Sequence, residues 1–154
     1  MQNKNCNVGK RRSENLPKDK IRVVFKDVDK PYEVKEISSD YKTFQQHVKG
    51  VFQILPLSME DNIDIIYNDC YLLNGMRANL ILPEQDNILG GPLIFAGYEP
   101  NEGDNISLTD EQIEIVKKFI HAHEVYNMSI IEAYYTLQEI QATKSETEAE
   151  WWTQ

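Results

Sequence analysis

Hydrophobic and polar residues alternate in the first part of the chain that shows a regular pattern. Residues 21–26 (IRVVFK) alternate in this way, and residues 32–37 (YEVKEI) begin a second such run. Period-two alternation is typical of a strand with one buried face. Residues 27–31 (DVDKP) between the two runs are rich in turn-forming types, so the pattern predicts a β-hairpin.

A helical period follows the hairpin. Tyr41, Phe44 and Val48 recur at positions i, i+3 and i+7, and Ser39 and Asp40 stand where a capping residue is expected. This spacing predicts a short helix whose apolar face is buried.

Further apolar runs predict the remaining strands. Residues 52–57, 63–67 and 92–98 each form a short apolar run, and Pro56 marks either an edge strand or the end of the first strand. Residues 77–82 fit either a strand or a helical turn, because so short a run has no decisive period.

Two C-terminal helices have the clearest start signals. Thr109 and Gln112 have the spacing of a capping box, in which the two side chains satisfy free backbone N–H groups, and Ser129 and Glu132 repeat it. The stripes expected to face the core are Ile113, Val116 and Ile120 in the first helix, and Ile130, Tyr134 and Leu137 in the second. The order of elements predicts an α+β domain: a mainly antiparallel sheet, one short helix after the first hairpin and two C-terminal helices.

The length of 154 residues is that of a single domain. Residues 1–18 are polar, basic and without period, so we expect a disordered basic arm. Residues 19–141 would form the α+β domain, and residues 142–154 an acidic tail that ends in Trp151 and Trp152. The paired tryptophans fit equally well a docking segment for a partner and a segment that folds back onto the domain.

Composition indicates a cytoplasmic protein. Two cysteines give no disulfide framework, and the N-terminus lacks the apolar segment of a secretory signal. The longest apolar stretch, residues 92–98, is far shorter than the ~20 residues that span a bilayer. We therefore expect no membrane association.

The formal net charge of −9 is concentrated in the middle of the chain. Residues 58–115 contain twelve acids against Arg77, whereas residues 1–20 have a balance of +4. A strongly acidic surface repels phosphates and attracts basic partners, although it can also serve solubility alone. The acids with which we expect a partner to interact are Glu60, Asp61, Asp64, Asp69, Glu84, Asp86, Glu99, Glu102 and Asp104.

Residue types that carry catalysis are few. His121 and His123 point about 200° apart on a helix, so they cannot share a metal there, and we expect a solvated helix end. His47 is expected at the surface. Cys70 is expected to be a buried core thiol, because no base stands at a suitable spacing. The sequence thus predicts no catalytic residue, no metal site and no cofactor.

Four ordered blocks of sequence resemble a known family. They are PYEVKEISSDYKTFQQHVKGVFQILPL, IIYNDCYLLNG, ILGGPLIFAG and GDNISLTDEQIEIVKKF, and over residues 21–120 the chain resembles the domain-of-unknown-function family numbered thirty-eight forty-six. The resemblance implies an origin in bacteriophages, plasmids or other mobile elements of Gram-positive bacteria. It implies no catalytic residues.

One departure from the family pattern concerns a possible ligand site. The family's Asn-Arg pair is Asn79-Leu80 here, Arg77 stands where the family has Pro, and the family's Gly-Thr pair is Gly90-Gly91. Arg77, Asn79, Gly90 and Gly91 could line a pocket for a small ligand such as a nucleotide signal. Arg77 fits an intramolecular ion pair as well, and the glycines fit a turn.

We therefore expect a non-enzymatic binding protein of a phage or other mobile element. In its sharpest form it is an acidic inhibitor of a host defence protein that binds nucleic acid, and the partner is a host protein with a basic surface. We do not expect direct binding to nucleic acid. The alternative is a module that binds or sequesters a small ligand. The oligomeric state is left open.

Overall fold

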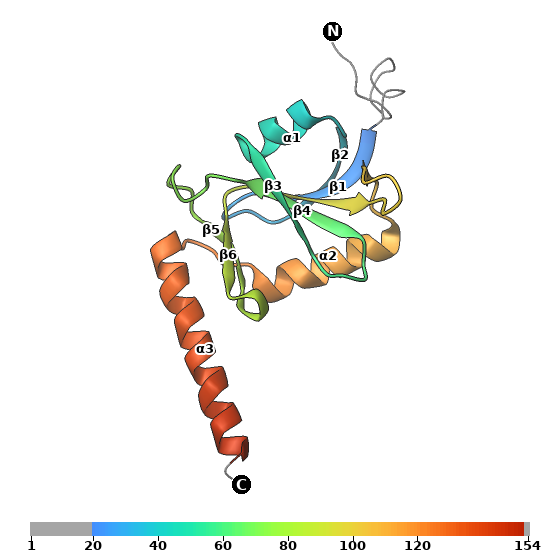
Figure 1. The fold of residues 1–154 in the computed structure, drawn as a ribbon. Coiled ribbons are helices and arrows are strands. Elements are labelled where there is room, and N and C mark those ends of the chain that lie inside the picture. The colour runs from blue at the N-terminus through green and yellow to red at the C-terminus, as the bar shows by residue number, and fades with distance from the viewer. Residues whose placement is uncertain (1–19, 153–154) are drawn as a thin grey trace.

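The computed structural model describes the backbone of residues 20–152 and the side chains of residues 20–147. The strands are β1 (Lys20–Lys26), β2 (Glu33–Ser38), β3 (Phe52–Pro56), β4 (Ile63–Asn68), β5 (Ala78–Leu82), β6 (Asn87–Gly90), β7 (Leu93–Tyr98) and β8 (Asn105–Ile106). The helices are α1 (Tyr41–Val48), the 3-10 helix η2 (Pro83–Gln85), α2 (Asp110–His123) and α3 (Ile130–Trp152). The protein has the predicted α+β class (Figure 1). The basic arm expected at residues 1–18 lies outside the described residues.

The strands form two antiparallel sheets. The larger has the order β2-β1-β7-β4-β3, with β8 paired to β7. Strand β3 lies at the edge and ends at Pro56, so both interpretations of this proline hold. The predicted hairpin is β1–β2, with Ile21 opposite Ile37. For residues 77–82 the sequence left a strand and a helical turn as alternatives. These residues contain the strand β5, which pairs with β6 in a separate hairpin. Strand β6 was not predicted, because four residues show no period.

Both faces of the larger sheet are covered. Figure 1 shows α1 on one face and α2 on the other. Val23 packs in the core cluster that includes α1, whereas its neighbour Val24 packs in the cluster that includes α2. A strand covered on both faces does not alternate between buried and exposed residues as a half-exposed strand does. For this reason Lys26, which the alternation placed on the polar side of the predicted strand, is fully buried.

The first two helices begin as the sequence predicts. The carboxylate of Asp40 accepts a hydrogen bond from the N–H of Thr43 at the start of α1. At the start of α2, the side chains of Thr109 and Gln112 form both bonds of a capping box. The predicted inner stripe of α2 is buried: Ile113, Val116 and Ile120.

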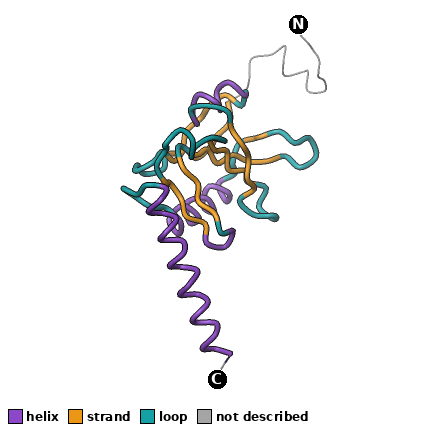
Figure 2. Tube along the Cα trace, turned by 60° about the vertical axis from the view of Figure 1, so that its left-hand side comes forward, coloured by secondary structure: helices purple, strands orange, loops and turns teal. Residues whose placement is uncertain are grey.

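Helix α3 begins at the second predicted capping box, where Glu132 N–H donates to Ser129 Oγ at 3.1 Å. Ala133 and Leu137 pack against the β5–β6 hairpin, whereas Tyr134, expected inside, is exposed. The helix continues through the expected acidic tail to Trp152 and projects from the domain (Figures 1 and 2). The tryptophan pair therefore stands in its last turn, and both side chains lie outside the described part.

Candidate acidic binding surface

Two acidic loops lie together at one end of the larger sheet. Ile63, the first residue of β4, pairs with Gly97 near the end of β7. The loop before β4 and the loop after β7 therefore leave the sheet at the same end of these two strands. The N–H of Tyr98 donates to the carbonyl oxygen of Asn62 at 2.9 Å and joins the two loops. They carry five of the predicted partner-binding acids: Glu60, Asp61, Glu99, Glu102 and Asp104.

The start of α2 adds two further acids at this end of the sheet. The amide of Gln112 donates to the carbonyl oxygen of Asp61 at 2.9 Å, so the first turn of α2 is tied to the loop before β4. Asp110 and Glu111 are exposed in that turn. Acidic residues in the first turn of a helix are favoured by the helix dipole, so their place in the sequence did not mark them as binding residues. We call the seven residues Glu60, Asp61, Glu99, Glu102, Asp104, Asp110 and Glu111 the acidic end.

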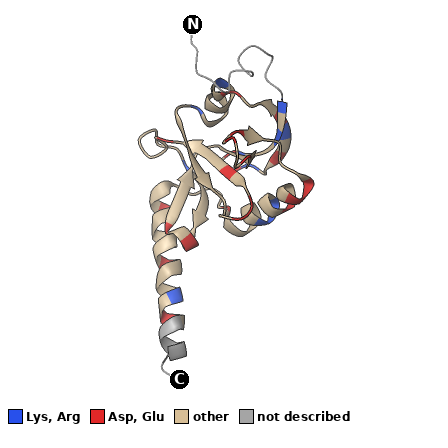
Figure 3. Ribbon diagram, turned by 45° about the vertical axis from the view of Figure 1, so that its right-hand side comes forward, with Lys and Arg blue, Asp and Glu red and all other residues tan. Residues whose placement is uncertain are grey.

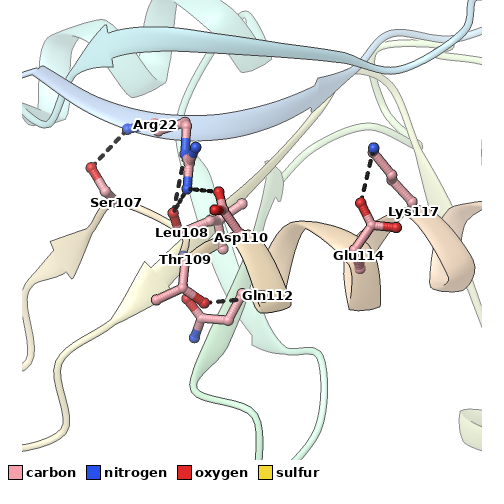
Figure 4. Close-up of polar contacts among 8 residues, drawn as sticks. All are labelled: Arg22, Ser107, Leu108, Thr109, Asp110, Gln112, Glu114 and Lys117. Carbon is pink, nitrogen blue, oxygen red and sulfur yellow. Dashed lines mark hydrogen bonds and ion pairs between the residues drawn. The ribbon is translucent and has the colours of Figure 1, made fainter.

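The side chain of Arg22 connects strand β1 to the start of α2 (Figure 4). Its guanidinium donates to the carbonyl oxygen of Leu108 at 2.9 and 3.2 Å and lies 2.8 Å from the carboxylate of Asp110. The Asp110 side chain is almost fully exposed, so this ion pair contributes little stability by itself. Its effect is positional, since it holds α2 beside the acidic loops.

A hollow of about 390 Å³ lies between the two loops, and its wall includes Met59, Asp64 and Tyr98. Asp64 was expected on the binding surface, but it is only 8 % exposed. Its carboxylate accepts a hydrogen bond from Asn105 Nδ2 at 3.0 Å. Burial raises the pKa of Asp64, and the hydrogen bond from Asn105 opposes this rise only in part. Asp64 is therefore a buried structural residue.

The other three predicted acids lie elsewhere, and Figure 3 shows acidic positions on several separate parts of the ribbon. Asp69 follows the opposite end of β4, where its N–H donates to the carbonyl oxygen of Val51 at 2.8 Å. Glu84 and Asp86 lie at the turn between β5 and β6. The acidic block of the sequence is thus divided among separate surfaces.

Glu84 contacts His123, which the sequence placed at a solvated helix end. His123 Nε2 lies 2.8 Å from Glu84, and Nδ1 lies 2.7 Å from the carbonyl oxygen of Phe119. The His123 side chain is only 10 % exposed, so the expectation is wrong for it, whereas His121 is exposed. Partial burial raises the pKa of Glu84, but hydrogen bonds from His123 and from the backbone of Glu84, together with the charges of His123 and Lys144, outweigh this, and the pKa is lowered overall.

The residues of the small-ligand alternative lie together, but their polar groups are already bonded. Asn79 is fully buried, and its amide donates to the carbonyl oxygens of Lys26 and Gly91 at 2.8 and 2.9 Å. A Cβ on Gly90 would lie 2.5 Å from the ring of Tyr71. Gly91 has a φ of +77°, as the turn interpretation requires.

Arg77 is 47 % exposed and lies 3.5 Å from the carboxylate of Asp29. This is the intramolecular ion pair that the sequence left open beside a ligand contact. Arg77 is consequently the one member of the predicted set whose side chain reaches solvent, and its charge is already compensated.

Lys26 is a central polar residue that the sequence did not reveal. Its Nζ donates to Asn79 Oδ1 and to the carbonyl oxygen of Asp27, both at 3.0 Å, and lies 3.9 Å from the carboxylate of Glu124. Burial lowers the pKa of Lys26, although nearby carboxylates, that of Glu124 first among them, oppose this. Lys26 therefore joins β1, β5 and the end of α2.

The remaining candidates for chemistry are dispersed. Cys70, expected in the core, is exposed, because residues 69–75 form turns rather than a buried strand. His47 Nδ1 lies 2.8 Å from the carbonyl oxygen of Thr43 within its own helix. Between residues 20 and 147, no three His, Cys, Asp or Glu side chains are grouped to hold a metal ion. In the same part of the chain, no helix combines the length and apolar character needed to cross a membrane.

Comparisons with known proteins identify a family. No curated protein and no solved structure matches the chain. A family described as a domain of unknown function, DUF3846, matches residues 21–121, from the start of β1 almost to the end of α2. The match leaves α3 outside and agrees with the resemblance found over residues 21–120. Because it covers more than half of the 154 residues, the chain belongs to the DUF3846 family.

Proposed function

We propose that this protein is a non-enzymatic binding protein of a phage or another mobile element. It inhibits a host defence protein by covering that protein's basic nucleic-acid-binding surface with the acidic end. The observation that supports this best is that three separate segments bring carboxylates together at one end of the sheet. These segments are residues 57–62, residues 99–104 and the first turn of α2.

Charge and rigidity both favour such a role. A surface that binds nucleic acid carries Lys and Arg placed to meet phosphates, and carboxylates on a firm support compete for those same groups. The loops are held by the Tyr98–Asn62 and Gln112–Asp61 hydrogen bonds, so little ordering is needed on binding. Met59 is 88 % exposed in the wall of the hollow and offers an apolar contact on this surface.

The small-ligand alternative has weaker support. The amide of Asn79, which would line its pocket, already donates to the carbonyl oxygens of Lys26 and Gly91. His47 and His123 each contact a backbone carbonyl oxygen of their own helix, and His123 also contacts Glu84. These two side chains are thus engaged in structural contacts.

A matched pair of charge reversals tests the proposal. Glu60→Lys with Glu102→Lys changes the acidic end, and Glu33→Lys with Glu36→Lys makes the same change of net charge on edge strand β2. Tagged wild type and both variants are used to capture proteins from nuclease-treated Gram-positive host lysate. We expect the wild type and the β2 variant to retain one basic nucleic-acid-binding protein. We expect the acidic-end variant, or high salt, to release it.

The captured protein then provides the functional readout. Its binding to nucleic acid should be blocked by the wild type and by the β2 variant, but not by the acidic-end variant. Equal capture and equal inhibition by the two variants would contradict the proposal, because net charge alone would then account for binding.

A further inference from the structure

A second surface lies at the other end of α2, between α3, β6 and the turns after β4. It is a groove of about 550 Å³ whose walls include Tyr71, Leu72, Ile88, Ile131, Tyr134 and Tyr135. The OH of Tyr71 donates to the carbonyl oxygen of Ile88 at 2.7 Å, so one wall is held in place by a hydrogen bond.

Large apolar side chains are exposed around this groove. Ile131 is 68 % exposed, and Tyr134, Tyr135 and Leu72 are each more than half exposed. Leu73, next to Leu72 in the chain, is 87 % exposed. A contiguous apolar patch beside a groove is typical of a protein-binding surface rather than of scattered surface residues.

The shape of the patch favours a helix as its occupant. Ile131, Tyr134 and Tyr135 have i, i+3 and i+4 spacing, so they form one ridge along α3. A partner helix can pack its own ridge between this one and the wall formed by Tyr71 and Ile88. Such binding takes apolar anchors at helical spacing from the partner.

The charges around the groove define the chemistry of that helix. Asp86 lines the groove, and Asp69, Glu132 and Glu139 are exposed on the segments that flank it. Flanking Lys or Arg side chains would meet these carboxylates. A second copy of the chain would instead bring the same carboxylates against one another.

We propose that this groove binds a basic amphipathic helix of a partner protein, with apolar side chains between α3 and β6 and basic side chains on the acidic rim. The groove is separate from the acidic end, so this proposal goes beyond the proposed function and does not depend on it.

A defined peptide tests the proposal with the full-length chain. The probe is a synthetic Leu/Lys peptide of about five helical turns with leucines at i, i+3, i+4 and i+7. Its control has the same composition in an order that gives no apolar face. Affinities are measured by calorimetry at physiological salt. We expect the amphipathic peptide to bind at least tenfold more tightly than its control.

Two variants of α3 locate the binding. Ile131→Lys with Tyr135→Lys places charge in the groove, and Thr143→Lys with Thr147→Lys makes the same change of charge further along the helix. We expect the groove variant to lose at least tenfold in affinity and the other variant to stay within about threefold. Circular dichroism checks that both variants fold, which is expected because the four side chains are exposed.

The remaining outcomes separate this proposal from the proposed function. Glu60→Lys with Glu102→Lys, at the acidic end, should leave peptide affinity within about threefold of the wild type. Equal binding of the two peptides, or unchanged affinity in the groove variant, would overturn the proposal. A dimer of the free protein that the groove variant abolishes would also overturn it, because the occupant would then be a second copy.

Discussion

Lys26 and Asn79 join the two sheets of the protein through their side chains. Lys26 lies on β1 of the larger sheet, Asn79 lies on β5 of the smaller one, and each bonds to the other. Burying polar groups costs free energy unless they are hydrogen-bonded, and here the bonds are made. The pair therefore fixes how the β5–β6 hairpin sits on the sheet, a role that its residue types alone do not indicate.

Replacing Asn79 tests this structural role against a role in ligand binding. Asn79→Ala removes one of the two hydrogen bonds of the buried Lys26 ammonium and the amide that donates to the carbonyl oxygens of Lys26 and Gly91. We expect the free energy of unfolding to fall by about 3 kcal/mol or more, measured by urea denaturation. Asn74→Ala, at an exposed asparagine, is the control and should change it by less than about 0.5 kcal/mol. Unchanged stability in Asn79→Ala would contradict the structural role.

Asp64 gives the protein a predictable pH dependence. Burial raises the pKa of this carboxyl in the folded state, so the folded chain binds the proton more tightly than the unfolded chain does. Its contribution to stability therefore decreases as pH rises from the ordinary Asp pKa through the raised one. Asp64→Asn removes this term, and we expect the variant to gain stability relative to the wild type as pH rises over that range.

Urea unfolding at a series of pH values between acid and neutral measures this difference. Asn74→Ala, which changes an exposed residue and no titratable group, should run parallel to the wild type over the same range. A constant difference between the wild type and Asp64→Asn would show that the carboxyl does not titrate differently on folding.

The two C-terminal helices start in the same way but are packed over different lengths. Helix α2 buries its stripe from Ile113 to Ile120 against the sheet. Helix α3 buries Ala133 and Leu137, and Gln141 donates to the carbonyl oxygen of Pro83 at 2.8 Å. Residues 142–147 are exposed. Residues 142–147 of α3 thus add little to the core.

Shortening α3 tests where its packed part ends. A chain that stops after Lys144 keeps every buried side chain of α3 among the described residues, so we expect its free energy of unfolding to stay within about 0.5 kcal/mol of the full chain. A chain that stops after Glu132 loses Ala133 and Leu137, and it should lose about 3 kcal/mol or more. Both are measured by chemical denaturation. A marked loss in the longer chain would indicate that the Trp151–Trp152 segment packs on the domain.

At the scale of elements, the starts of the two C-terminal helices could be predicted because they depend on residues close together in the chain. The capping boxes at Thr109 and Ser129 depend on residues three positions apart, so the sequence contains all that is needed to find them. The register of the inner face of α3 depends instead on the β5–β6 hairpin. For this reason Ala133 is buried and Tyr134 is exposed, contrary to the expected stripe.

At the scale of the whole molecule, the fold distributes the acidic residues over distinct surfaces. Antiparallel pairing of β4 and β7 brings two loops together, and Gln112 adds the start of α2. The same fold places Asp69, Glu84 and Asp86 away from this end of the sheet, and it buries Asp64. The effect of a charge reversal should therefore depend on its position, as the matched variants at Glu60 with Glu102 and at Glu33 with Glu36 examine.

The sequence by itself determined the α+β class, the first hairpin, the helix starts and the family. These features depend on local periods, on caps or on blocks of adjacent residues. Only the tertiary structure decided which polar residues are buried, as at Lys26, Asn79 and Asp64, and which distant segments form the acidic end and the apolar groove. Burial and proximity arise when elements far apart in the chain cover one another, and no local period encodes that.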